Sequence, residues 1–228
     1  MSEALVDSLL PDLGACGAFS AGPVSIGADR ILRIQGYSDL ERIRPRIRTA
    51  AEFSARLAGD LTAGQVGFRR IAIEQVADGV LRLDGGYTFQ SEAFDKFLGG
   101  CDSVVAFVLT AGEAFDASID EMMRGDQPVK GLFLDSAGWL AVEAVTRQFA
   151  EALKRDCAAR GLRLTRRLGP GYSYRIDTRM EPWDLTEQRI LFDALGNAPL
   201  PSRLLESSAM HPKMSRSGLY GIRAAATT

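Results

Sequence analysis

The sequence has little of the chemistry that many enzymes place in their active sites. It contains one histidine, His211, and three cysteines, Cys16, Cys101 and Cys157, with no Cys-x-x-Cys pair. A Ser-His-Asp triad or a multi-histidine metal site would have to use His211 itself. The odd number and wide spacing of the cysteines argue against a disulfide framework and against a thiolate zinc site. We expect the cysteines to be reduced and mostly buried.

Strong net charge and long apolar runs are also missing. Lys and Arg number 27 against 29 Asp and Glu, so the formal net charge is −2 and no global field attracts nucleic acid or anionic membranes. The N-terminal segment lacks a basic leader region, and no stretch approaches the roughly 18 consecutive apolar residues of a membrane span. The sequence therefore predicts a cytoplasmic protein with neither nucleic acid nor membrane as a partner.

The composition is that of a folded protein with one substantial core. The chain has 228 residues, of which 46% are hydrophobic and 25% charged. Because residues 14–27 are rich in Gly, Ala and Ser, we predict an N-terminal arm over residues 1–36 and a folded domain over residues 37–228. Within the arm, residues 2–13 are predicted to form a short helix and residues 30–37 a short strand.

The hydrophobic periodicity places helices and hairpins in mixed order. Helices are predicted over 39–61, 91–97, 113–124, 128–160 and from Asp184 to Leu195. Capping boxes are predicted at the start of the first helix, from Ser38 and Glu41, and of the last, from Asp184 and Glu187. The helix over 128–160 is expected to kink near Gly131 or Gly138. Strands are predicted over 66–76, 80–83, 87–89, 101–110, 203–210 and 215–222, and residues 175–181 as a loop. The unbroken apolar run in 101–110 indicates a central strand buried on both faces. This order predicts a single-domain α+β fold, with a mostly antiparallel twisted sheet packed against long helices.

Residues 163–174 form the most informative stretch of the chain. Helical spacing gives way there to a short extended run that ends at Pro170–Gly171, a pair suited to the two central positions of a type II turn. Arg166 and Arg167 precede the turn, and the phenols of Tyr172 and Tyr174 follow it. Guanidinium groups can bind a carboxylate or phosphate through two parallel hydrogen bonds. The stretch is either a small-molecule contact loop or a plain connector between a helix and the sheet.

Two segments resemble motifs of the activation domain of cobalamin-dependent methionine synthase. Residues 167–172, Arg-Leu-Gly-Pro-Gly-Tyr, fit the Arg-x-x-x-Gly-Tyr motif of that domain. After a helix with a Glu-Gln pair near its start, residues 205–212 and 215–220 are similar to its Glu-Ser-x-Ala-Met-x-Pro and Ser-x-Ser-Gly segments. Weaker similarity extends back to about Leu98, and the N-terminal third looks more like free-standing relatives of the domain.

This resemblance implies reductive reactivation of a corrinoid cofactor. In the family, an electron from a flavodoxin or a similar donor is trapped by methyl transfer from S-adenosylmethionine to cobalt. Cobalamin would be carried by a partner, either a corrinoid-binding protein or a methyltransferase subunit. The chain itself would hold the sulfonium methyl group in position, with no catalytic residue of its own, as part of methionine biosynthesis.

The resemblance also implies roles for particular residues. Arg167 would pair with the carboxylate of S-adenosylmethionine, Gly171 would let the backbone approach the ligand, and Tyr172 would place its ring near the sulfonium or the corrin. Backbone groups of the turn would contact the adenine or ribose, and these belong to Leu168, Gly169 and Pro170. Tyr174 is interpreted as ordinary packing and His211 as an exposed turn residue.

Departures from the family pattern leave two function classes open. The family uses an acidic residue on the long helix, for which Glu143 and Glu151 are candidates, and another before the sheet that has no clear counterpart. Because the chain ends soon after Tyr220, we expect part of the contact surface to be missing or supplied by another chain. The chain is either a free-standing reactivation subunit that binds S-adenosylmethionine, or a non-enzymatic partner of a corrinoid protein that kept the fold.

Overall fold

The computed structural model describes residues 9–225 of the chain. The helices are α1 (Ala28–Ile34), α2 (Pro45–Leu61), α3 (Ala93–Leu98), α4 (Ala114–Arg124), α5 (Pro128–Ala159), the 3-10 turn η1 (Leu185–Glu187) and α6 (Gln188–Leu195). The strands are β1 (Cys16–Ser20), β2 (Gln65–Ala77), β3 (Val80–Leu83), β4 (Tyr87–Gln90), β5 (Ser103–Thr110), β6 (Leu162–Leu168), β7 (Ser173–Ile176), β8 (Arg179–Pro182), β9 (Arg203–Leu204), β10 (Met210–His211) and β11 (Ser215–Ala224).

Seven of the described strands form one sheet in the order β4-β3-β2-β5-β11-β6, with β1 paired to β2. Every pairing among residues 9–225 is antiparallel. Strand β5 lies between β2 and β11, and all eight of its residues are buried. The prediction of a central strand buried on both faces is therefore confirmed.

Two hydrophobic clusters cover the two faces of the sheet. One face packs on α5, where Phe107 of β5 and Tyr220 of β11 meet Phe149. The opposite face packs on α3, α6 and the buried Trp183. Alternate residues of β5 point into the two clusters, as the pleat of a strand requires. The predicted α+β architecture, with a mostly antiparallel sheet packed against helices, is confirmed.

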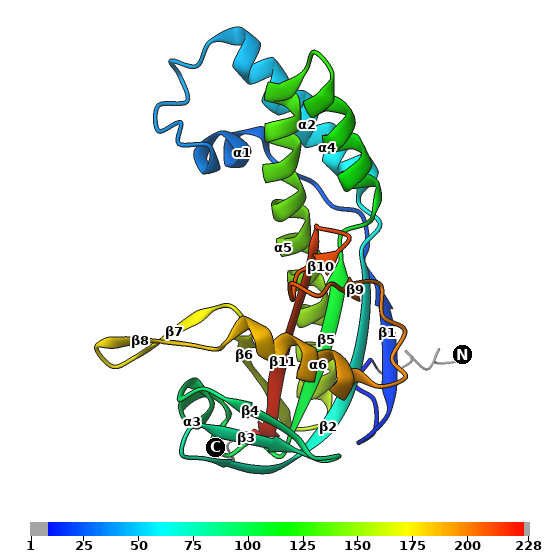
Figure 1. Ribbon diagram of the computed structural model, residues 1–228, viewed down its shortest axis with the longest axis vertical. Helices are drawn as coiled ribbons and strands as arrows, with labels where there is room; N and C mark the ends of the chain where they lie inside the picture. The colour runs from blue at the N-terminus through cyan, green and yellow to red at the C-terminus, as the bar shows by residue number, and fades with distance from the viewer. Residues whose placement is uncertain (1–8, 226–228) are drawn as a thin grey trace.

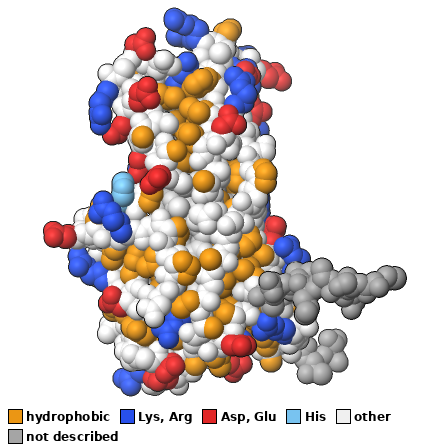
Figure 2. Space-filling view, turned by 90° about the vertical axis from the view of Figure 1, so that its right-hand side faces the viewer, with side chains coloured by type: hydrophobic (Ala, Val, Ile, Leu, Met, Phe, Trp, Pro, Cys, Tyr) orange, Lys and Arg blue, Asp and Glu red, His pale blue; other side chains and the backbone are white. Residues whose placement is uncertain are grey.

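The molecule is elongated because α5 extends well beyond the sheet (Figure 1). Its N-terminal half packs with α1, α2 and α4 at one end, and its C-terminal half covers the sheet. In the side view, charged side chains gather at the outer end of this helical part, whereas the middle of that face is mostly uncharged (Figure 2). No helix among the described residues is long and apolar enough to cross a membrane.

Several predicted elements in the N-terminal half differ from the structure. Residues 30–37 were expected as a strand, but α1 is helical, with Ile31 and Leu32 buried and Ile34 exposed. The spacing of these three apolar residues fits both the helical period of 3.6 and the strand period of 2, and tertiary packing selects the helix. Residues 9–13 form bends and turns, and the rest of the helix predicted over 2–13 lies outside the described residues. Because β1 joins the main sheet, the arm contributes to the domain, and its boundary at residue 36 stays a prediction.

Helix α2 begins six residues later than its periodicity predicted. It starts at Pro45, and Arg44 before it has extended backbone. A residue that precedes proline is disfavoured in the helical region, whereas proline suits the first helical position. The predicted capping box of Ser38 and Glu41 is therefore wrong, and the Glu41 N–H instead donates to Asp39 Oδ1 at 3.1 Å.

The long helix is continuous over 32 residues, and the kink near Gly131 or Gly138 stays a prediction. Its glycines serve close packing. A Cβ at Gly138 would lie 2.7 Å from Met214 Sδ, and a Cβ at Gly131 would lie 3.0 Å from Met123 Sδ. The predicted strand over residues 203–210 is also wrong, since β9 and β10 are two-residue strands that pair around a turn.

Candidate functional site

The turn at Pro170–Gly171 has the predicted type II form. Gly171 has φ +81°, and the Tyr172 N–H donates to the Gly169 carbonyl at 3.4 Å, which closes the turn. The backbone continues into β7, which forms a hairpin with β8 where the sequence predicted a loop. The turn therefore lies between the end of β6 and the base of this hairpin.

Backbone and side-chain hydrogen bonds fix the turn on both sides. The Gly171 N–H donates to the Trp183 carbonyl at 2.7 Å, and the Trp183 N–H donates to the Tyr172 carbonyl at 2.9 Å. The buried Tyr174 hydroxyl accepts from the Gly169 N–H at 2.6 Å and donates to its carbonyl at 3.1 Å. Tyr174, interpreted from the sequence as ordinary packing, thus also positions the turn.

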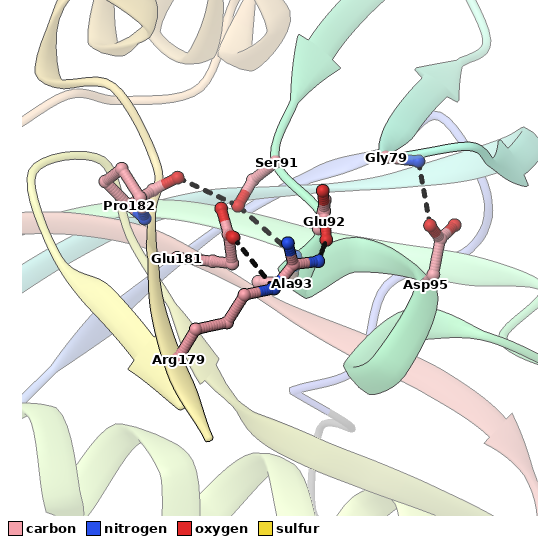
Figure 3. A network of polar contacts seen from close by, with 8 residues as sticks. All are labelled: Gly79, Ser91, Glu92, Ala93, Asp95, Arg179, Glu181 and Pro182. Carbon is pink, nitrogen blue, oxygen red and sulfur yellow. Dashed lines mark hydrogen bonds and ion pairs between the residues drawn. The ribbon is translucent and has the colours of Figure 1, made fainter. Parts of the chain in front are cut away.

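The hairpin that follows the turn is anchored to β4 and α3 (Figure 3). Arg179 of β8 pairs with Glu92 and, at 3.1 Å, with Glu181. The Ser91 hydroxyl donates to the Pro182 carbonyl at 3.0 Å. The first contact attaches β8 near the tip of the hairpin and the second attaches it at the base, so both ends of β8 are held to the segment between β4 and α3.

The two arginines before the turn point to different surroundings. Arg167 lies opposite Tyr220 in the β6–β11 pairing, and its guanidinium carbon is 4.4 Å from the centre of the Tyr172 ring. Its Nη1 is buried and has no hydrogen-bond partner among the described residues. The guanidinium of Arg166 instead lies over the Phe97 ring at 4.8 Å. Arg167 is therefore the arginine that the turn brings to the site.

Two glycines allow β6, β11 and the turn to come close together. A Cβ at Gly169 would lie 2.7 Å from Arg167 Nη1 and 3.0 Å from the Ser217 carbonyl oxygen. A Cβ at Gly218 would lie 2.3 Å from the Leu168 carbonyl oxygen and 3.4 Å from Arg167 Cγ. Real Cβ atoms do not approach a backbone oxygen to 2.3 Å, so Gly218 must be glycine, whereas a Cβ at Gly169 would force the end of the Arg167 side chain to shift.

A cavity of about 370 Å³ lies beside this turn. Strand β6 pairs with β11 only from Leu219 onward, which leaves the preceding residues of β11 without a β6 neighbour. The cavity is lined by 170–172 of the turn, by 208–210 and 215–217, and by Trp139, Leu185, Gln188 and Lys213. Residues of both motifs that resemble the family thus lie at one cavity.

A buried glutamine joins the second motif to α6. Gln188 Nε2 donates to the Ser208 carbonyl at 2.7 Å, and the Ser217 hydroxyl donates to Gln188 Oε1 at 2.7 Å. Asp184 caps η1 as predicted, since its carboxylate accepts from the Thr186 N–H at 2.7 Å. The predicted capping box is wrong, because Glu187 accepts from the Trp183 indole at 2.7 Å instead.

Glu143 of α5 faces Arg216 of β11. Arg216 Nη1 donates to Glu143 Oε2 at 2.6 Å and to the Thr146 hydroxyl at 3.0 Å. Partial burial raises the pKa of Glu143, but the hydrogen bond and charge of Arg216, with Arg167 and Arg147 nearby, outweigh burial and lower the pKa overall. Arg216 was missed by the sequence reasoning, although a charged residue between the two serines of Ser-x-Ser-Gly was a visible signal.

Of the predicted ligand-binding residues, Pro170, Gly171 and Tyr172 line this cavity, whereas Arg167, Leu168, Gly169 and Glu143 do not. Glu151, the second acidic candidate on α5, is exposed. His211 Nδ1 is 3.6 Å from Asp116 Oδ2, and the residue lines a separate opening of about 600 Å³. Cys101 and Cys157 are buried, which raises the pKa of each thiol, and Cys16 is exposed. In residues 9–225, no group of three or more His, Cys, Asp or Glu side chains could hold a metal ion.

Comparison with known proteins identifies the fold. No protein-family model and no curated protein sequence matches the chain at a significant level. The structure matches a crystal structure of the MetH reactivation domain bound to AdoHcy with a TM-score of 0.63 over 96% of this chain and 82% of that chain. The sequence identity is 14%, so the match concerns the fold. The chain therefore has the fold of the MetH reactivation domain, as the resemblance to the methionine synthase activation domain predicted.

Proposed function

We propose that this chain is a free-standing reactivation subunit of a corrinoid-dependent methyltransferase, and that it binds S-adenosylmethionine in the cavity beside the Pro170–Gly171 turn. One observation carries the proposal: segments 170–172, 208–210 and 215–217 line a single cavity in this fold. AdoHcy, the ligand of the fold match, is what remains of S-adenosylmethionine after its methyl group has been transferred. A domain with this fold and cavity is therefore a reasonable receptor for the methylated form.

The chemistry of the site fits the ligand. Arg167 has a buried Nη1 without an acceptor, and leaving such a donor unpaired costs about 1 to 3 kcal/mol, which a ligand carboxylate would recover. Glu143 has a lowered pKa, despite the raising effect of partial burial, because Arg216 donates to it, so it is a carboxylate at neutral pH. The half-exposed Trp139 and Tyr172 offer aromatic faces to an adenine or a sulfonium. Sites of this size commonly hold small molecules.

The contribution of this chain is binding and orientation. A partner-bound corrinoid would supply the nucleophile for the methyl group once a flavodoxin-like donor has provided one electron. Arg167 would hold the amino-acid end of the ligand, and residues 168–170 would hold the adenosine through backbone groups. The apolar side chains of Trp139, Tyr172 and Leu185 border the cavity and are partly exposed, which suits contact with that partner. A cytoplasmic role in methionine biosynthesis follows from this assignment.

A second candidate is a corrinoid-protein partner that kept the fold without the ligand. The observation in its favour is the ion pair between Glu143 and Arg216, because a carboxylate that already has a cationic partner is less available to a ligand ammonium. Direct measurement of ligand binding separates the two candidates.

The decisive measurement is calorimetry with S-adenosylmethionine on the wild type and on Arg167→Ala. Loss of a charge-assisted contact of about 1.5 to 3 kcal/mol predicts an affinity roughly 10 to 100 times weaker for the variant. Arg155→Gln, which removes an exposed charge from the C-terminal part of α5, is the matched control and should bind like the wild type. Absence of binding by the wild type, with a corrinoid partner present, would refute the proposed function. Unchanged affinity of Arg167→Ala would refute only the role of Arg167.

A further inference from the structure

Arg216 is a largely buried cation with an incomplete set of partners. Only 11% of its side chain is exposed, and it lines the 370 Å³ cavity. Nη1 donates to Glu143 and Thr146, whereas Nε is buried without a hydrogen-bond partner among the described residues. Buried guanidinium donors are normally paired, so the unsatisfied Nε points to an acceptor that is not part of the described chain.

Arg216 and Arg167 reach the same region of the protein from neighbouring strands. Arg216, Gly218 and Tyr220 alternate along β11, so all three face α5, and successive positions on that face are about 6.6 Å apart. Arg167 pairs opposite Tyr220, and its Cγ is 3.4 Å from where a Gly218 Cβ would be. Gly218 places no side chain between them, and the charges of both arginines lower the pKa of Glu143.

We propose that Arg216 is a second specificity-determining arginine, which binds the ligand carboxylate together with Arg167. This inference rests on the proposed function and changes the role of one residue. Glu143, expected from the resemblance to contact the ligand, instead positions Arg216 through the 2.6 Å hydrogen bond. Two guanidinium groups with free donors match the several acceptor sites of one carboxylate. The pocket therefore selects adenosyl ligands that carry a carboxylate.

The test compares two ligands that differ in the amino-acid end. S-adenosylhomocysteine has the carboxylate, whereas 5′-methylthioadenosine keeps the adenosine and a thioether but lacks it. We expect Arg216→Gln to weaken S-adenosylhomocysteine binding by roughly 10 to 100 times, as the loss of a charge-assisted hydrogen bond predicts. Binding of 5′-methylthioadenosine should change less than about twofold, which also verifies that the variant folds with an intact pocket.

A double-mutant cycle tests the role of Glu143. Glu143→Gln should weaken S-adenosylhomocysteine binding in the wild type but have no further effect once Arg216→Gln is present, because it acts only through Arg216. If Arg216→Gln weakens both ligands equally, or neither, the inference is wrong while the proposed function stands. An additional loss from Glu143→Gln in the Arg216→Gln background would mean that Glu143 contacts the ligand directly. Failure of the wild type to bind any adenosyl ligand would refute the proposed function and this inference with it.

Discussion

Replacing Tyr174 with phenylalanine removes a hydroxyl that holds Gly169 from both sides. In the native protein the hydroxyl accepts from the Gly169 N–H at 2.6 Å and donates to the Gly169 carbonyl at 3.1 Å. The carbonyl keeps a second hydrogen bond, from the Tyr172 N–H at 3.4 Å, but Gly169 is buried and its N–H loses the hydroxyl acceptor. The variant therefore creates an unsatisfied donor next to Arg167.

The expected cost follows from that unsatisfied donor. A buried N–H without a partner costs about 1 to 3 kcal/mol, and phenylalanine fills almost the same volume, so no cavity contributes. Urea denaturation should show a midpoint lowered by about 1 M, taking an m-value of about 2 kcal/mol/M. Ligand affinity should fall as well, because the released turn no longer fixes Arg167 and Tyr172.

A matched variant makes this test specific. Tyr172→Phe removes a hydroxyl from the same turn, but the Tyr172 side chain is 41% exposed and water replaces any lost contact, so stability should change by less than about 0.5 kcal/mol. If Tyr174→Phe also stays within that range, the hydroxyl does not stabilise the turn, and Tyr174 is ordinary packing after all.

Two further predictions concern β11. Gly218→Ala places a Cβ 2.3 Å from the Leu168 carbonyl oxygen, so urea or thermal unfolding should show a free energy of unfolding lower by about 1 to 3 kcal/mol, and ligand binding should weaken. The control is Gly22→Ala, whose Cβ would meet its nearest atom at 3.5 Å and which should leave stability nearly unchanged. Equal stabilities of the two variants would contradict the close approach at Gly218. Burial raises the pKa of Tyr220 to about 12, against the lowering effect of Arg167 and Arg216. Because the pKa of Tyr220 is higher in the folded than in the unfolded protein, the neutral phenol stabilises the fold by up to about 3 kcal/mol. This stabilisation is complete below about pH 10 and is lost between about pH 10 and 12. Between about pH 10 and 12, the free energy of unfolding should decrease less steeply for Tyr220→Phe than for the wild type. An identical decrease would refute the raised pKa of Tyr220.

Some elements were predictable because their signals are local. An unbroken apolar run indicated the buried strand β5, and a proline followed by a glycine indicated the turn at Pro170–Gly171. The β7–β8 hairpin was missed because apolar and polar residues do not alternate regularly in its strands. It is held instead by a contact between Arg179 and Glu92, which are 87 residues apart in the sequence. Helix α1 was mistaken for a strand because its short apolar run fits both periods.

The sequence by itself determined the buried strand, the long helices, the type II turn and the two motifs that resemble the activation domain, since each depends on chemistry within a few residues. Only the tertiary structure decided that Arg167 turns toward the site while Arg166 lies over Phe97. It also placed Arg216 against Glu143, 73 residues apart, at a cavity left where β6 no longer pairs with β11. The physical reason is that packing across both faces of the sheet sets these distances, and local propensity does not reach that far.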